Sequence, residues 1–174
     1  MLINLLLGLL SVFWLASAGH KLADVQRFTH TLGQYKWVIP IKPELLVAGV
    51  ILAEVVAAIL LLLSGYQLLA LALAGLLLTA YTALIGLNIV SGNRDLDCGC
   101  LFGSQEQGLS ASLLWRNAGI LLLHLTAALS LQAGALTHTS DVLISLLFGA
   151  VVLLVGVIAH QLIRNQSHIN ALKR

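Results

Sequence analysis

The chain has 174 residues, of which 59% are hydrophobic and only 9% are charged. Soluble domains contain about 25% charged residues, so this composition excludes a water-soluble enzyme and predicts an integral membrane protein. The net charge of +2 is small, and nothing in the composition indicates a nucleic-acid partner.

The hydrophobic residues form five runs, each long enough to cross a hydrocarbon core about 30 Å thick as a helix of roughly 20 residues. They cover residues 2–19, 44–63, 66–90, 112–131 and 141–163. Backbone amides in lipid must be hydrogen-bonded internally, and the runs lack the alternation of barrel strands. The sequence therefore predicts an all-α, polytopic membrane helical bundle, with a four-helix core, a fifth transmembrane helix and residues 1–174 in a single domain.

A short amphipathic helix is predicted at the membrane interface between the first two runs. Its apolar residues recur at steps of three and four: Leu22, Val25, Phe28, Leu32 and Tyr35. Pro40 and Pro43 then end the helix and turn the chain into the second run. Residues 20–39 form either a connector without chemistry or a lid, because they lie on the same side of the membrane as the third connection.

The basic residues are placed asymmetrically. All nine lie in the first connection, in or beside the third connection, or in the C-terminal tail: Lys21, Arg27, Lys36, Lys42, Arg94, Arg116, Arg164, Lys173 and Arg174. With five spans, these segments share one side of the membrane. The positive-inside rule makes that side cytoplasmic and places the N-terminus outside.

The third connection, residues 91–111, holds the two cysteines of the chain, Cys98 and Cys100, separated by Gly99. Residues two apart in an extended strand cannot form a disulfide, so the backbone must turn, which Gly99 permits. A strained disulfide is readily reduced, which favours a redox-active pair that exchanges disulfides. A shared soft metal ion and a structural or idle pair are the alternatives.

The attacking species in disulfide exchange is the thiolate. Arg116 and the N-terminal amides of the fourth run would favour thiolate formation, whereas Asp95 and Asp97 would oppose it. Arg116 is therefore a candidate catalytic residue beside Cys98 and Cys100.

A second group of candidates lies deep in the bundle. With a rise of 1.5 Å per residue, Glu54, Tyr81 and His124 each lie roughly 13 to 18 Å from the cysteine side, near the midplane. Ionisable groups at this depth are costly and face a partner or a cavity. Glu54 and His124 are expected to share a proton, with Tyr81 hydrogen-bonded to one of them. This predicts a proton relay or the polar end of a quinone pocket, or else polar contacts that only hold helices together. The histidine spacing fits no metal motif.

Several motifs are spread over nearly the whole chain: Ala18-Gly19-His20-Lys21-Leu22, then Phe28, Leu32, Tyr35 and Pro40, and finally Asp97-Cys98-Gly99-Cys100, Phe102-Gly103 and Arg116-Asn117. Together they resemble the methylamine-utilisation MauE family, within the wider DoxX-like group of small membrane proteins. The cysteine motif followed by Arg-Asn is the specific part. Leu101 separates Cys100 from Phe102, unlike the family pattern.

The resemblance implies a multi-pass protein of the bacterial cytoplasmic (inner) membrane that helps a disulfide-rich exported dehydrogenase subunit to mature. Cys98 and Cys100 would exchange a disulfide with a thioredoxin-like partner. One cysteine pair cannot run an internal relay, so electrons would pass directly to a quinone, the candidate cofactor, or to a second protein. This role places the cysteines outside the cytoplasm, opposite to the charge count.

Three functions follow from these observations. The first is a membrane thiol-disulfide oxidoreductase or maturation factor built on Cys98, Cys100 and Arg116. The second is a transport protein that passes a soft metal ion, copper or mercury, from the cysteines past Glu54 and His124. The third is a non-enzymatic membrane scaffold that docks a partner through residues 20–39.

Overall fold

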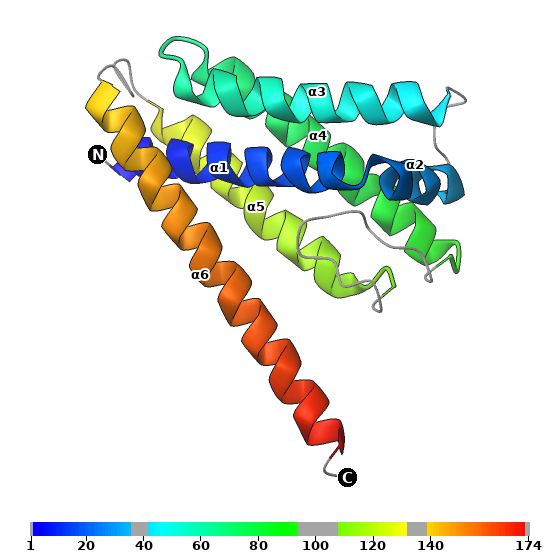
Figure 1. Ribbon diagram of the computed structural model, residues 1–174. Helices are drawn as coiled ribbons and strands as arrows, with labels where there is room; N and C mark the ends of the chain where they lie inside the picture. The colour runs from blue at the N-terminus through cyan, green and yellow to red at the C-terminus, as the bar shows by residue number, and fades with distance from the viewer. Residues whose placement is uncertain (1, 36–41, 94–107, 132–138, 173–174) are drawn as a thin grey trace.

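A computed structural model of the protein describes residues 2–35, 42–93, 108–131 and 139–172. Within these ranges the chain forms helices and no strand, which confirms the all-α prediction. The helices are α1 (Leu2–Ala23), α2 (Val25–Gln34), α3 (Pro43–Leu62), α4 (Gln67–Val90), α5 (Ala111–Ser130) and α6 (Thr139–Leu172) (Figure 1). All except α2 are long and apolar enough to span a membrane.

Local sequence signals explain where several helices begin and end. The Asp24 carboxylate accepts a hydrogen bond from the Arg27 backbone N–H at 3.0 Å and caps α2. Pro43 begins α3, in the first turn where its missing N–H has no cost. Gly65, with a φ of 86°, makes the tight turn between α3 and α4.

The predicted boundaries of the second, third and fourth runs differ from α3, α4 and α5 by one residue or less at each end. The first helix is longer than the predicted run 2–19, because α1 continues to Ala23. The prediction that Lys21 belongs to the connection after this run is therefore wrong. Lys21 lies in the last turn of α1 and is buried inside the bundle.

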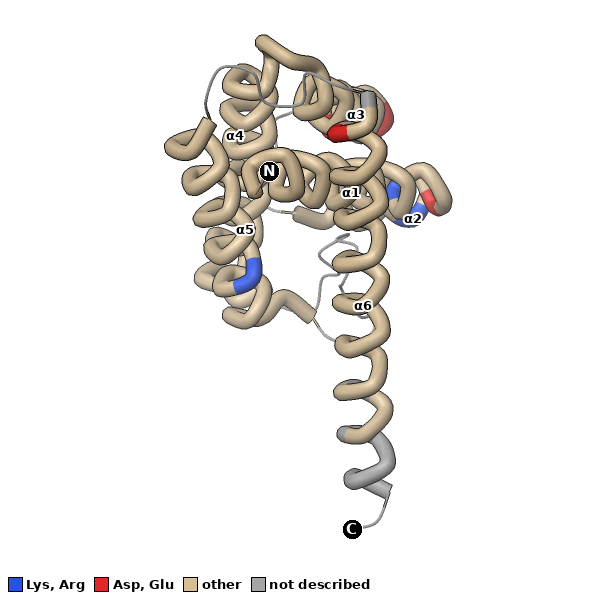
Figure 2. The backbone as a smooth tube through the Cα atoms, turned by 90° about the vertical axis from the view of Figure 1, so that its left-hand side faces the viewer, with Lys and Arg blue, Asp and Glu red and all other residues tan. Residues whose placement is uncertain are grey.

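The four-helix core predicted from the sequence consists of α1, α3, α4 and α5. In this core, α1 packs against α3 and α5, and α4 packs against the same two helices. Figure 2 shows α1 in the middle of the bundle, with α3, α4, α5 and α6 around it. The core is lined by apolar side chains of α1, α3, α4 and α5: Leu7, Leu10, Trp14, Ala57, Ala58, Leu61, Ala70, Leu71, Ala74, Leu78 and Ala127.

The fifth transmembrane helix, α6, packs on α1 near its own beginning and then diverges from the bundle (Figure 1). The two helices touch backbone to backbone where they cross. A Cβ atom at Gly149 would lie 2.8 Å from the carbonyl oxygen of Gly8, and one at Gly8 would overlap the carbonyl of Ser145. Ser145 and Gly149 thus form a small-xxx-small contact of the kind that brings membrane helices close together.

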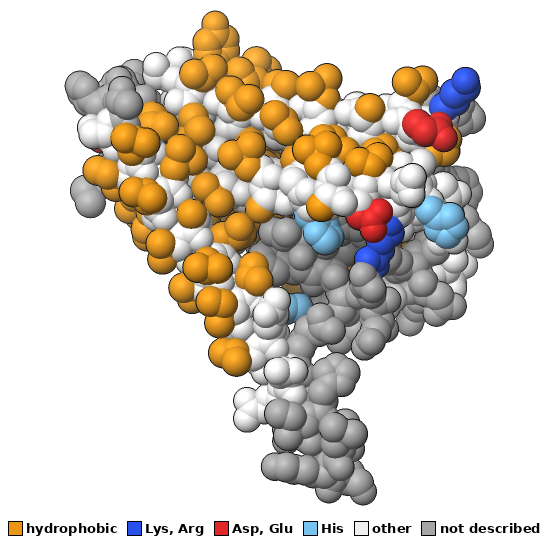
Figure 3. All heavy atoms as spheres, viewed as in Figure 1, with side chains coloured by type: hydrophobic (Ala, Val, Ile, Leu, Met, Phe, Trp, Pro, Cys, Tyr) orange, Lys and Arg blue, Asp and Glu red, His pale blue; other side chains and the backbone are white. Residues whose placement is uncertain are grey.

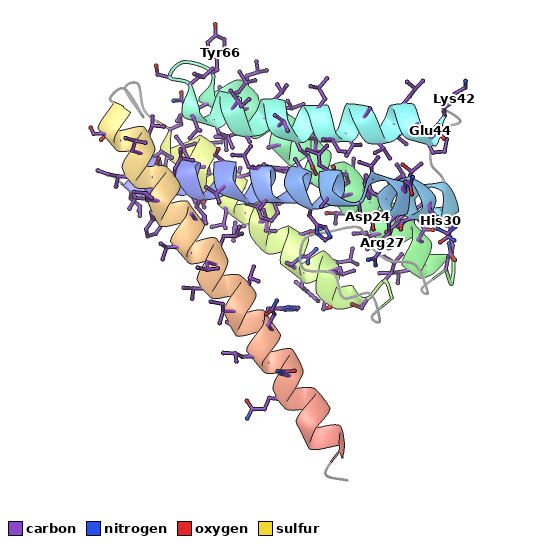
Figure 4. The ribbon with its side chains drawn as sticks, in the orientation of Figure 1. Asp24, Arg27, His30, Lys42, Glu44 and Tyr66 are labelled. Carbon is purple, nitrogen blue, oxygen red and sulfur yellow. The ribbon has the colours of Figure 1, made fainter. Side chains whose placement is uncertain are left out.

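The predicted amphipathic helix is α2. It packs on α3 through Phe28, which joins Ala18, Val47 and Ile51 in a small apolar cluster. Figure 3 shows hydrophobic side chains along the helices and charged side chains gathered at the end formed by α2 and the start of α3. The charged residues at this end include Asp24, Arg27, Lys42 and Glu44 (Figure 4).

Candidate functional site

A buried ion pair joins α1 to α3. The Lys21 ammonium lies 2.7 Å from Glu54 Oε1, and the two side chains are only 4% and 0% exposed. Because helical side chains lean toward the N-terminus, Lys21 extends from the last turn of α1 back into the bundle. Glu54 is eleven residues into α3, about 16 Å from its start at 1.5 Å per residue. The pair therefore places two charges deep between the helices.

Glu54 Oε1 is surrounded by hydrogen-bond donors. Besides Lys21 Nζ, it accepts from the Ser17 hydroxyl at 3.1 Å and from the Tyr81 hydroxyl at 2.8 Å. Ser17 in turn accepts a hydrogen bond from Lys21 Nζ at 2.7 Å, one helical turn away on α1. Glu54 Oε2 is equally buried, yet it has no hydrogen-bond partner among the described residues. One oxygen of the Glu54 carboxylate thus accepts three hydrogen bonds, and the other accepts none from the described residues.

Two aromatic rings complete the surroundings of the Lys21 ammonium. Its nitrogen lies 5.4 Å from the ring centroid of Phe28 and 5.4 Å from that of Tyr81. Both distances are within the range of a cation–π interaction. We call Ser17, Lys21, Phe28, Glu54 and Tyr81 the Lys21 cluster. Ser17 and Lys21 come from α1, and the other three residues come from α2, α3 and α4, respectively. The cluster therefore connects the amphipathic helix to three helices of the core.

His124 on α5 has a different set of partners. Its Nε2 accepts a hydrogen bond from the indole N–H of Trp14 at 3.0 Å, and its Nδ1 lies 2.8 Å from the Ile120 carbonyl oxygen. The indole N–H can only donate. The ring proton is therefore on Nδ1, where it donates to the carbonyl, and the imidazole is neutral.

Of the three deep residues predicted to act together, the structure brings Tyr81 to Glu54 by a direct hydrogen bond. It joins His124 to Trp14 and Ile120 instead. Lys21, Ser17 and Trp14 were missed by the sequence reasoning. The available signal was the spacing of Ser17 and Lys21, which places them on one face if the first helix continues past residue 19.

The ends of the cysteine loop are attached to the end of α2. Asn93 donates from Nδ2 to the Gln34 carbonyl oxygen at 3.4 Å and to Asn88 Oδ1 at 3.2 Å. On the other side of the loop, Leu109 packs in a small apolar cluster with Ile85 and Tyr35. Cys98 and Cys100 themselves lie in residues 94–107, outside the described residues.

Arg116 lies in the second turn of α5 and is partly buried. The next residue, Asn117, is buried and donates from Nδ2 to the Thr82 hydroxyl of α4 at 3.2 Å. This contact fixes the start of α5, and with it Arg116, against α4 on the side where the cysteine loop begins and ends. The role predicted for Arg116 toward the cysteines involves residues outside the described ranges.

Comparisons with known proteins identify the family to which the chain belongs. A model of the MauE family, described as methylamine utilisation protein MauE, matches residues 1–133. The methylamine utilization protein MauE of Paracoccus denitrificans is 28% identical over 147 residues, which cover 84% of this chain and 78% of that protein. No solved structure matches the chain significantly. The family match takes in α1 to α5, and so the Lys21 cluster, the cysteine motif and Arg116; the chain belongs to the MauE family of methylamine utilisation proteins.

Proposed function

We propose that this multi-pass protein of methylamine utilisation exchanges a disulfide through Cys98 and Cys100 with a thioredoxin-like protein. In this role it would support disulfide formation in an exported client at the bacterial cytoplasmic membrane. One observation carries the proposal. The two cysteines of the chain stand one residue apart in a loop whose two ends, at Asn93 and Leu109, both lie against the end of α2.

The exchange conserves electrons and protons between the two proteins. A thiolate of the partner attacks one sulfur of the Cys98–Cys100 disulfide, a mixed disulfide forms, and the other cysteine leaves as a thiolate. The second thiol of the partner then breaks the mixed disulfide. The partner ends oxidised, and the loop pair ends as a dithiol that has gained two electrons and two protons. The reverse sequence oxidises the loop pair at the expense of the partner.

A single pair needs a further acceptor before it can oxidise a second partner molecule. Within a membrane, a quinone fits this requirement, because it takes up two electrons and two protons to become a quinol. Arg116, held at the start of α5 by its neighbour Asn117, supplies positive charge that favours the attacking or leaving thiolate.

The experiment traps the mixed disulfide. A thioredoxin-like partner whose second cysteine is replaced by serine cannot complete the exchange, so it should remain covalently attached to the wild-type chain. The double variant Cys98→Ser/Cys100→Ser should lose this adduct entirely. Normal client maturation with the double-serine protein would contradict the proposal and favour the scaffold function.

A thiol-alkylation experiment shows on which side of the membrane Cys98 and Cys100 lie. Because Cys98 and Cys100 are the only cysteines of the chain, a membrane-impermeant alkylating reagent reports only on the loop. Labelling from outside the cell after reduction would place the loop on the exported side, where the client is. Labelling only after the membrane is opened would place it in the cytoplasm, as the charge distribution predicts.

A further inference from the structure

Helix α2 is too short and too poor in helix-forming residues to be stable by itself. It has ten residues, and isolated helices of fewer than about 12–15 residues are marginal in water. Four of the ten are β-branched residues or glycine, which favour a helix only weakly: Val25, Thr29, Thr31 and Gly33. The helix therefore depends on its contacts with the rest of the protein.

These contacts are few. Phe28 and Thr31 are the two buried residues of α2, and Phe28 packs with Val47 and Ile51 of α3. At the other end of α2, the Gln34 carbonyl oxygen accepts its hydrogen bond from Asn93 at 3.4 Å, which is long for such a bond. Segments with few buried apolar contacts open locally at a lower free energy than the core of a protein. Local opening is therefore expected at α2 before the four-helix core unfolds.

The chain has a hinge where α1 meets α2. Asp24, with φ of −144° and ψ of 70°, interrupts the helix between them, and Figure 1 shows α2 as a separate short helix at the end of α1. Rotation at Asp24 moves α2 and leaves α1 in place. If Phe28 moves away, Lys21 keeps its contacts with the core residues Ser17, Glu54 and Tyr81. The opening of α2 thus leaves no buried charge without its partner.

We propose that α2 is a strap over the cysteine loop, which opens by local unfolding with Asp24 as its hinge. In the closed form, the end of α2 holds both ends of the loop, through Gln34 on Asn93 and Tyr35 beside Leu109. In the open form, both contacts are lost, and a protein-sized thiol reaches the loop more readily. This second half rests on the proposed function, because the loop is where the disulfide would be exchanged. The opening itself makes and breaks no covalent bond.

The first measurement follows the opening of α2 without the cysteine pair. In the variant Cys98→Ser/Cys100→Ser/Thr31→Cys, the single cysteine replaces a buried residue of similar volume. A water-soluble maleimide reacts with it only while α2 is open, so at low reagent concentration the labelling rate in nanodiscs reports the open population. Gln26→Cys in the same background marks an exposed position of α2 and should be labelled fast.

The substitution Gly33→Ala should slow the labelling of Thr31→Cys by about two- to fivefold, because alanine favours a helix over glycine by that factor. A Cβ atom at Gly33 meets nothing within 4 Å, so the change acts on the stability of α2 alone. The matched control is Gly75→Ala on α4, where a Cβ atom also meets nothing within 4 Å. This control should leave the labelling rate unchanged, since α4 stays folded when α2 opens.

Two results would overturn the opening of α2. An equal labelling rate in the two alanine variants would show that local unfolding of α2 does not expose residue 31. Labelling of Thr31→Cys as fast as that of Gln26→Cys would show that α2 is not held closed on α3.

The second measurement tests the effect of the strap on the cysteine pair, in the chain with both cysteines. The probe is reduced thioredoxin whose second cysteine is replaced by serine. Its thiolate attacks one sulfur of the Cys98–Cys100 disulfide, the other cysteine leaves as a thiolate, and the adduct remains. Gly33→Ala should slow adduct formation by the same factor as it slows labelling, and Gly75→Ala should not.

The two measurements fail in different ways. An undiminished rate of adduct formation with Gly33→Ala would overturn the control of the loop by α2, and would leave the proposed disulfide exchange intact. The absence of any adduct with the wild-type chain would contradict the proposed exchange and with it that control. The opening of α2 is decided by the labelling of Thr31→Cys alone.

Discussion

The two halves of α1 are held in the bundle by opposite kinds of contact. Near its N-terminus, Gly8 lets the backbone of α1 touch the backbone of α6 at Ser145 and Gly149. Near its C-terminus, Ser17 and Lys21 reach Glu54 on α3 through charged and polar hydrogen bonds. The first contact depends on the absence of side chains, and the second depends on long side chains with particular chemistry.

The two contacts show two ways in which helices can be held together inside a membrane. Lipid is as apolar as leucine, so burial of apolar surface does not drive helix association inside a membrane, and close backbone packing or polar contacts must supply it. The family match, residues 1–133, includes every helix around the Lys21 cluster and ends before α6. Both halves of α1 therefore lie within the matched residues, but only the polar half has all its partners there, because Ser145 and Gly149 on α6 lie beyond them.

The largest effect is expected from a substitution that removes one partner of the Lys21–Glu54 ion pair and leaves the other in place. Glu54→Leu should destabilise the protein by about 3–5 kcal/mol, because it leaves the Lys21 ammonium buried without its counter-charge. The double variant Lys21→Met/Glu54→Leu should recover most of this loss, since it removes both charges. Thermal unfolding in nanodiscs measures both effects.

Glu44→Leu is the matched control for this prediction, because Glu44 is exposed in the first turn of the same helix (Figure 4). It should change the stability by no more than about 0.5 kcal/mol. If Glu54→Leu were as mild as Glu44→Leu, or if the double variant were no better than the single one, the ion pair would not hold this half of α1.

A smaller loss of stability is expected from a substitution where α1 and α6 cross, at Gly8 and Gly149. Gly149→Ala places a methyl group 2.8 Å from the Gly8 carbonyl oxygen, so α6 must move away from α1. Overpacking of this kind typically costs about 1–3 kcal/mol. The loss is measured by thermal unfolding, and the separation of the helices by the distance between spin labels on α1 and α6.

Gly156 provides the control on the same helix, because a Cβ atom there meets nothing within 4 Å. Gly156→Ala should be neutral or slightly stabilising, since alanine is the better helix former. Equal behaviour of the two alanine variants would show that the crossing of α1 and α6 contributes no stability in the membrane.

The same contrast explains how much could be predicted from the sequence. The spans follow from apolar runs of membrane length, and depth along a helix follows from 1.5 Å per residue. Depth correctly indicated that Tyr81 is level with Glu54. It does not say in which direction a side chain points around the helix axis. His124, at similar depth, instead contacts Trp14.

Lys21 shows a second limit. The apolar run ends before it, and hydropathy assigns a lysine there to the water phase. The structure continues the helix and directs the long side chain back to Glu54, a choice set by the partner on α3. Likewise, the chain has 15 glycines, and only the helix packing reveals that Gly8 and Gly149 meet.

The smallest loss of stability is expected when the aromatic ring of Phe28, which α2 places against the Lys21 ammonium, is removed. Phe28→Leu keeps an apolar side chain against Val47 and Ile51 but removes the ring over the Lys21 ammonium. A loss of about 1 kcal/mol is expected, as for other cation–π contacts. Phe148→Leu, at an exposed position of α6, controls for the loss of an aromatic ring as such.

A double-mutant cycle isolates the interaction of Phe28 with the charge. In the background Lys21→Met there is no cation to stabilise, so Phe28→Leu should cost less there than in the wild type. An equal cost in both backgrounds would mean that Phe28 acts only through apolar packing on α3. A reduced cost would mean that Lys21 holds α2 as well as α3, and the polar end of α1 would then be what attaches the helix beside the cysteine loop to the core.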